Sequence, residues 1–205
     1  MDKFFNSTFD ALTNVVPGSI ILVYLLIFDT SINSLDLLIL KLNNIEIGSA
    51  AVVIFVSYVI GFAISPIGKY VYQKIGYKIW PANTSSLDEF TISEKFILIR
   101  QYSPSNFKYV ESWNMFCTLA HNLAITSLIL ILNCIIRIIL FGFTDNFLFV
   151  FVAVFAVLSF FIFINRAVSF RNWALNDLNT AVKTLDLINE MKSGPKRFEI
   201  NLKRE

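Results

Sequence analysis

The chain has 205 residues and a formal net charge of +2; 56% of its residues are hydrophobic and 16% are charged. Soluble domains are typically about 45–50% apolar and about 25% charged, so this composition excludes an ordinary soluble domain and indicates an integral membrane protein. The charged and polar residues before the first apolar run are not typical of a cleavable signal peptide. We therefore expect that run to remain as a membrane anchor.

Four apolar runs are predicted to cross the membrane as helices, and they cover residues 15–28, 47–64, 116–136 and 147–164. A bilayer core of about 30 Å needs about 20 helical residues, so the second and fourth runs fit with small polar flanks. The first run is short and contains Pro17 and Gly18. These two residues favour a kink or a shallow entry into the bilayer.

The distribution of lysine and arginine predicts the direction of the spans. Residues 29–46 contain one basic residue and residues 142–146 contain none, whereas residues 65–115 contain six and residues 165–205 contain eight. Basic loops favour the cytoplasmic side of a membrane. We therefore expect both termini and the central loop to be cytoplasmic, in a bacterial inner (plasma) membrane.

The expected fold is an all-α integral membrane protein with four transmembrane helices. Residues 1–64 are predicted to form an N-terminal amphipathic segment and a first transmembrane hairpin, and residues 116–165 a second hairpin. Small residues at Ser57, Gly61 and Ser65 recur every fourth position. This spacing lets helices approach closely in lipid, so we predict that these residues pack against a neighbouring helix.

The remaining parts are predicted to be cytoplasmic helices. In the loop 65–115, Thr91-Ile-Ser-Glu94 has the pattern of a capping box and predicts a helix over 92–102, which ends before Pro104. In residues 166–205, the fourth span is expected to continue to about residue 192 as an amphipathic helix packed on the short helices of the loop. Its apolar stripe also suits a second copy of the chain, so we expect a homo-oligomer.

The third span carries the polar side chains His121, Asn122, Asn133 and Arg137. Polar residues in a span generally face a bundle interior or a water-filled path, so these four are candidate pore or bundle-interior residues. Arg137 has two interpretations. It either snorkels to the outer interface, or it faces the bundle interior or a pore mouth and pairs with an aspartate such as Asp145.

A second candidate set is basic and follows the fourth span. It would sense an anionic ligand, and it comprises Arg166, Arg171, Lys196, Arg197, Lys203 and Arg204. The tail from residue 194 either contacts anionic lipid headgroups or binds a nucleotide or nucleic-acid signal. A cytoplasmic partner protein is a further candidate for binding the tail.

The residues needed for known enzyme chemistry are missing, so we expect no enzyme, no cofactor and no metal. The chain has no phosphate-binding glycine loop, nucleophile elbow or HExxH motif. Cys117 and His121 share a helical face, but two ligands do not make a zinc site. Arg171-Asn172-x3-Asn176 resembles a helical-ribonuclease motif in which histidine takes the last position; asparagine cannot replace it as a general acid or base.

Three segments, VVPGS in the first span, SYVIG in the second and FRNWAL after the fourth, complete a layout across the whole chain. This layout resembles the small four-span membrane proteins of bacterial antiviral defence, which include channel effectors paired with nucleotidyltransferases. The resemblance implies an oligomeric pore or membrane-disrupting effector that halts the growth of an infected cell by depolarisation. The alternative is a non-conducting scaffold or adaptor that anchors a cytoplasmic partner.

Overall fold

The computed structural model describes residues 2–25, 40, 47–81, 91–142 and 147–187, and every regular element in these residues is a helix. The predicted all-α class is therefore confirmed for the described part of the chain. The chain divides into two compact units. Unit 1 comprises Met1–Ala82 and Asn114–Arg171, and unit 2 comprises Asn83–Trp113 and Asn172–Glu205.

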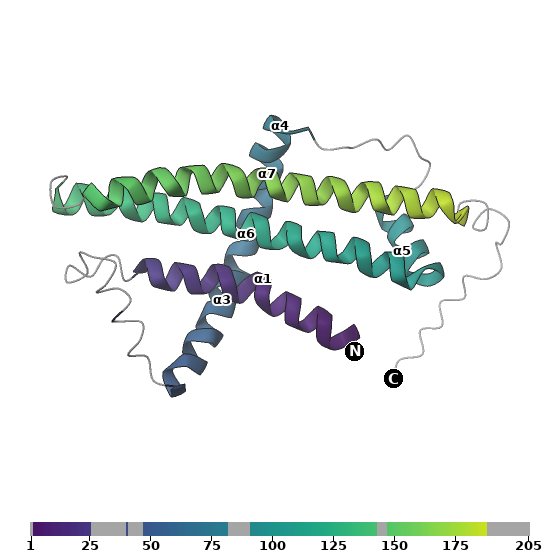
Figure 1. Cartoon of the computed structure of the whole chain (residues 1–205), viewed down its shortest axis with the longest axis horizontal. Coiled ribbons are helices and arrows are strands. Elements are labelled where there is room, and N and C mark those ends of the chain that lie inside the picture. The colour runs from purple at the N-terminus through teal and green to yellow at the C-terminus, as the bar shows by residue number, and fades with distance from the viewer. Residues whose placement is uncertain (1, 26–39, 41–46, 82–90, 143–146, 188–205) are drawn as a thin grey trace. The chain divides into compact units, whose positions relative to one another are not determined.

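Four long helices and two short ones build the described part of unit 1 (Figure 1). They are α1 (Asp2–Leu25), α3 (Ile47–Val71), the π-helix η2 (Tyr72–Gly76), α4 (Tyr77–Ile79) and the larger parts of α6 (Pro104–Phe141) and α7 (Phe147–Thr184). The helix predicted to end at residue 64 thus continues to residue 79. Lys69, Lys74 and Lys78 were assigned to a loop, but they lie on the exposed side of this helix, and no proline interrupts it between Pro66 and Pro81.

Three helical segments are long and apolar enough to cross a membrane: Gly48–Ile79, Pro104–Phe141 and Phe149–Thr184. The apolar part of α1, Ala11–Leu25, is shorter than the about 20 residues that a span needs. The described residues thus contain three candidate spans by length and composition. The predicted first span, 15–28, includes residues 26–28, which lie outside the described residues.

The helices α1 and α3 pack with their backbones in direct contact. A Cβ atom added at Gly18 would collide with the backbone of Ser57, and one added at Gly61 would collide with the backbone of Asn14. Gly18 of α1 contacts Ser57 of α3, and Asn14, which precedes Gly18, contacts Gly61, which follows Ser57. The two helices therefore run antiparallel at this contact. The contact of α1 with α3 thus depends on glycines, which have no side chain, and not on interlocking side chains.

Further along its length, the same helical segment contacts α6 and then α7, which it crosses in Figure 1. A Cβ atom at Gly68 would lie 2.7 Å from Nδ1 of His121 in α6. A Cβ atom at Gly76 would lie 2.8 Å from the side chain of Val168 in α7. Glycines 61, 68 and 76 therefore bring one helical segment against three others in turn.

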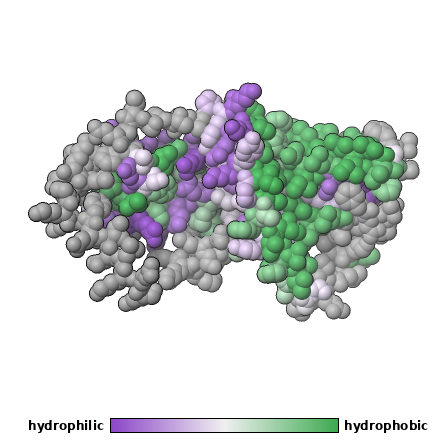
Figure 2. Space-filling model, turned by 180° about the vertical axis from the view of Figure 1, so that it is seen from behind, coloured by the Kyte–Doolittle hydropathy of each residue, from purple (hydrophilic) through white to green (hydrophobic). Residues whose placement is uncertain are grey.

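The outer surface of unit 1 is strongly hydrophobic. Figure 2 shows a continuous area of hydrophobic residues over one half of the face in view. Phe55 and Phe62 of α3 are 68% and 65% exposed, and Phe155 of α7 is 69% exposed. A soluble protein rarely exposes so much contiguous apolar surface, so this surface and the three long apolar helices indicate contact with a lipid bilayer.

Unit 2 contains α5 (Ile92–Tyr102), the first turns of α6 and the last turns of α7, around a core that includes Leu98, Ile99 and Leu178. The predicted capping box is confirmed, because Glu94 N–H donates to Thr91 Oγ1 at 3.3 Å and Thr91 N–H donates to Glu94 Oε2 at 2.7 Å. Hydrogen bonds from the Thr91 backbone and hydroxyl lower the pKa of the Glu94 carboxyl group.

The end predicted for α5 is confirmed at Tyr102, whereas the end predicted for α7, at about residue 192, is wrong. Pro104 is the first residue of α6, where its missing N–H costs no hydrogen bond. The helix α7 ends at Thr184, earlier than predicted, and Asp186 has a φ of 51°, a left-handed conformation that terminates helices. The basic tail from residue 188 lies outside the described residues.

Candidate functional site

One face of α6 carries a row of buried polar side chains inside unit 1. Asn122, Thr126, Asn133 and Arg137 are 0%, 1%, 9% and 4% exposed. Their spacings of four, seven and four residues place them on one side of a helix, over a length of about 22 Å. This length equals most of the thickness of a bilayer core, which is about 30 Å.

At one end of the polar row, Asn122 binds the backbone of α1. Its Nδ2 donates to the carbonyl oxygen of Thr13 at 3.0 Å, across a separation of 109 residues. In a regular helix, the N–H of residue 17 would donate to this carbonyl, but residue 17 is proline and has no N–H. The side chain of Asn122 thus supplies the donor that Pro17 removes, as membrane helices require.

His121 lies beside the polar row and packs against the π-helix. Its ring stacks on the ring of Tyr72 at 5.3 Å with an interplanar angle of 1°, and Gly68 leaves the space that the ring occupies. The Tyr77 hydroxyl donates to the Tyr72 hydroxyl at 3.3 Å. A π-helix is rare and often occurs at functional positions, so we include this aromatic stack in the candidate site with the polar row.

Several buried polar atoms of unit 1 make no hydrogen bond within the described part of the chain. They are Ser57 Oγ, His121 Nδ1, Asn122 Oδ1 and Asn133 Nδ2. An unmet buried hydrogen bond costs about 1–3 kcal/mol, and folded proteins keep few of them. Three of the four lie on α6, which marks its buried side as a candidate site for water, ions or a polar ligand.

Arg137 lies at the other end of the polar row, near the start of α7. Its guanidinium carbon is 4.2 Å from the ring centroid of Phe149 and 5.7 Å from that of Phe141. The side chain is buried against two aromatic rings, which attract a cation through their faces. Its predicted partner Asp145 lies outside the described residues.

The predicted helix-packing residues are divided between two environments. Ser57 and Gly61 lie against α1, at the backbone contact with Gly18 and Asn14. Ser65 is half-buried. The sequence did not indicate α1 as the partner of Ser57 and Gly61, nor the contacts of Gly68 and Gly76 further along.

Of the six basic residues predicted to sense an anionic ligand, the structure describes two. Arg166 is exposed, and Arg171 donates from Nη1 to Asn114 Oδ1 at 2.9 Å within unit 1. The other four, Lys196, Arg197, Lys203 and Arg204, lie outside the described residues.

Unit 2 has polar contacts that the sequence reasoning did not predict. Lys95 is 4% exposed and donates from Nζ to Asn179 Oδ1 at 2.7 Å, and Trp113 Nε1 donates to Asp177 Oδ2 at 2.8 Å. Each pair joins helices that are distant in the sequence, so no local pattern signals it. Within the described ranges, no group of three or more histidine, cysteine, aspartate or glutamate side chains could hold a metal ion.

The polar row, the Asn122–Thr13 hydrogen bond and the aromatic stack form the candidate site. Pro17 was a usable signal for part of it, because a proline inside an apolar helix leaves a carbonyl that needs a donor. Comparison with protein-family models, curated proteins and solved structures finds no match to this chain.

Proposed function

We propose that the chain is an oligomeric, channel-like membrane effector that is regulated through unit 2. The observation that carries this proposal is the polar row Asn122, Thr126, Asn133 and Arg137, buried in a unit with an apolar outer surface. Polar side chains are costly inside a membrane, and those that persist there generally belong to a path for ions or polar substrates. The hydrogen-bonding atoms left unmet along this row support such a path.

The proposed topology has four crossings, with α1 as the first. The antiparallel contact of α1 with α3 supports this topology, because a short apolar helix is held in place by its neighbour. The excess of lysine and arginine in residues 65–115 and 165–205 supports a cytoplasmic location for unit 2 and both termini. The host membrane in this proposal is the bacterial inner membrane.

The proposal includes assembly into a homo-oligomer. The polar row is covered by helices of its own chain, so one closed chain leaves no path for ions. Ions could pass only if these helices separate or if several copies together surround a path. The exposed apolar side chains of α3 and α7 provide surfaces for neighbouring copies as well as for lipid. A mass measurement in nanodiscs should show a closed ring of four or more chains, and a monomer would count against a pore.

The biological setting proposed is antiviral defence, in which opening of the path depolarises an infected cell and stops its growth. This setting rests on the similarity in layout to small four-span defence proteins. A nucleotide or nucleic-acid signal acting on Arg166, Arg171 and the basic tail is the corresponding trigger. Induced expression with the trigger should lower the membrane potential, as measured with a potential-sensitive dye.

Ion flux through purified protein in liposomes tests the proposal directly. Asn133→Leu replaces a buried amide by a larger apolar side chain with the same number and branching of heavy atoms, so it should block the path without opening a cavity. We expect ion flux to fall roughly tenfold or more, which corresponds to a barrier raised by about 1.4 kcal/mol. Thr118→Val is the matched control on α6, because the Thr118 hydroxyl only donates to the backbone of its own helix.

Equal flux in the wild type and Asn133→Leu would contradict a path along the polar row. A folded wild-type chain that passes no ions, with or without the trigger, would overturn the channel. It would favour the second candidate function, a non-conducting membrane scaffold or adaptor. One observation favours that alternative, because the amide of Asn122 is already used to hold α1 in place. Recovery of a stoichiometric cytoplasmic partner would then support it.

A further inference from the structure

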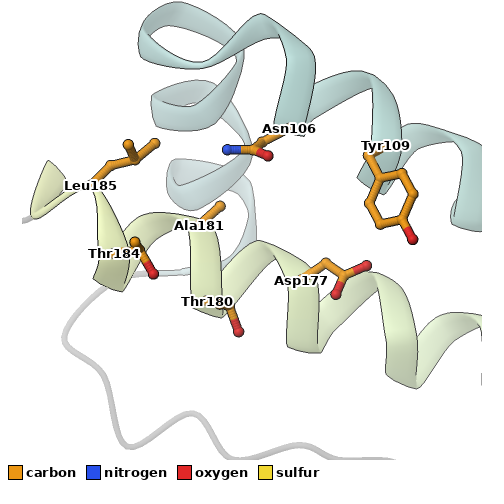
Figure 3. Close-up of a pocket in the computed structure, with 7 residues that line it drawn as sticks. All are labelled: Asn106, Tyr109, Asp177, Thr180, Ala181, Thr184 and Leu185. Atoms are coloured by element: carbon orange, nitrogen blue, oxygen red, sulfur yellow. The ribbon is translucent and has the colours of Figure 1, made fainter.

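Unit 2 contains an open pocket with a volume of about 290 Å³ (Figure 3). Asn106 and Tyr109 from the first turns of α6 line one side of it, and Asp177, Thr180 and Thr184 from the last turns of α7 line the other. Pockets that bind small molecules combine apolar surface with a few polar groups. This one has an amide, a carboxylate and three hydroxyl groups, and its size suits a small polar ligand.

The charge of the pocket comes from Asp177. Its Oδ2 accepts a hydrogen bond from Trp113 Nε1 at 2.8 Å, which orients the carboxylate and leaves Oδ1 available to a ligand. Trp113 is itself held edge-to-face against Trp173, at a centroid distance of 5.0 Å. Asp177 makes no ion pair within the described residues, and none of the side chains that line the pocket is basic. The pocket therefore favours a cation and disfavours a free phosphate ion.

An aromatic ring lies at the same end of the pocket as this carboxylate. Figure 3 shows the Asp177 carboxylate directed toward the side on which Tyr109 lies. The Tyr109 ring packs edge-to-face on Trp113 at 5.6 Å, so one indole group contacts both Tyr109 and Asp177. A carboxylate beside a tyrosine ring and its hydroxyl suits an organic ammonium ion, because the oxygen atoms accept its hydrogen bonds and the ring can attract its positive charge.

We propose that this pocket binds an organic ammonium ion. The ammonium group would lie between Asp177 and Tyr109, and its carbon chain would contact Ala181 and Leu185. Asn106 and the threonine hydroxyl groups would bind a second polar group at the other end. The ligand is either a free diamine or the ethanolamine headgroup of a lipid. Gating of the proposed channel by this ligand would rest on the proposed function, whereas binding of the ligand to the pocket does not.

Tryptophan fluorescence of the full chain in phosphatidylglycerol nanodiscs tests the proposal, because Trp113 contacts Asp177 directly. The probes are putrescine, ethanolamine and, at equal ionic strength, inorganic phosphate. We expect saturable changes with the two amines and none with phosphate. Asp177→Asn keeps an acceptor for Trp113 but removes the charge, so the apparent Kd for putrescine should rise about five- to tenfold. Tyr109→Leu should raise it about threefold.

Glu111→Gln is the matched control, since it removes a carboxylate of unit 2 outside the pocket, and its Kd should stay within about twofold of wild type. Nanodiscs that contain phosphatidylethanolamine identify the source of the ligand. Competition with putrescine indicates the headgroup, and unchanged putrescine binding indicates a free diamine. No saturable response to either amine in both nanodiscs, equal binding by a folded Asp177→Asn variant, or tighter binding of phosphate would overturn the proposal. Amine binding without ion flux would overturn only the channel.

Discussion

At the crossing of α1 and α3 in unit 1, the helices meet at Gly18 and Gly61, whereas the helices of unit 2 meet through large buried side chains such as Leu98 and Leu178. The difference matches the surroundings proposed for each unit, lipid for unit 1 and water for unit 2. Lipid tails are as apolar as leucine, so helices in a bilayer gain from close approach and hydrogen bonds. In water, burial of one leucine side chain contributes about 1.5–3 kcal/mol.

The polar contacts of the two units differ in the same way. In unit 1, Asn122 serves the backbone, because it donates to the carbonyl of Thr13. In unit 2, Lys95 and Asp177 bind other side chains, and both residues carry a charge. Backbone groups must be satisfied within a membrane protein, while charged groups are best tolerated where water is near. The contrast is limited to these contacts, because Arg171 of unit 1 also donates to a side chain, that of Asn114.

The largest expected effect is in unit 1, from a side chain added at the α1–α3 contact. Gly61→Leu should displace α1, since the new side chain would meet the backbone of Asn14, which cannot rotate away. We expect a loss of about 3 kcal/mol or more, measured by thermal unfolding in detergent. Gly48→Leu is the matched control on the same helix, because nothing lies near a Cβ atom at that position. Equal stability of the two variants would contradict the backbone contact.

In unit 2 the opposite change should be harmful, because its helices are held by filled volume. Leu178→Ala removes a fully buried side chain and should cost about 2–5 kcal/mol, measured by amide hydrogen exchange in α5. Ile97→Ala, at a side chain that is 58% exposed, should cost less than about 0.5 kcal/mol. A Leu178→Ala variant with wild-type exchange would show that unit 2 has no cooperative core.

A smaller effect is expected for the hydrogen bond between Asn122 and Thr13. Asn122→Ala should destabilise the protein by about 0.6–1.7 kcal/mol, the range for hydrogen bonds between membrane helices. In a Pro17→Ala background, residue 17 regains an N–H that can donate to Thr13, so the same change should cost less. Thermal unfolding of both single variants and the double variant gives the coupling energy. Additive effects would show that Asn122 does not compensate for Pro17.

Local patterns predicted the elements that local interactions determine. The capping box at Thr91 located the start of α5 at residue 92, and Pro104 located its end at residue 102. The apolar runs located the three helices that are long enough to cross a membrane. In each case the signal lies within a few residues of the feature, where hydrogen bonding and side-chain geometry act directly.

Contacts between distant residues could not be predicted in this way. The partner of Asn122 is 109 residues away in the sequence. His121 stacks on Tyr72, the first residue of a π-helix that no residue pattern predicted. The pocket around Asp177 was missed for the same reason, because α6 and α7 form it together. The contact of Arg137 with Phe149 in α7 likewise had no signal in the sequence.

The relationship between Pro17 and Asn122 also has an evolutionary consequence. A homologue with an ordinary residue at position 17 would satisfy the carbonyl of residue 13 within its own helix. Position 122 would then be released from the need for an amide and could become apolar. Covariation between these two positions would therefore record the same hydrogen bond in a set of natural sequences.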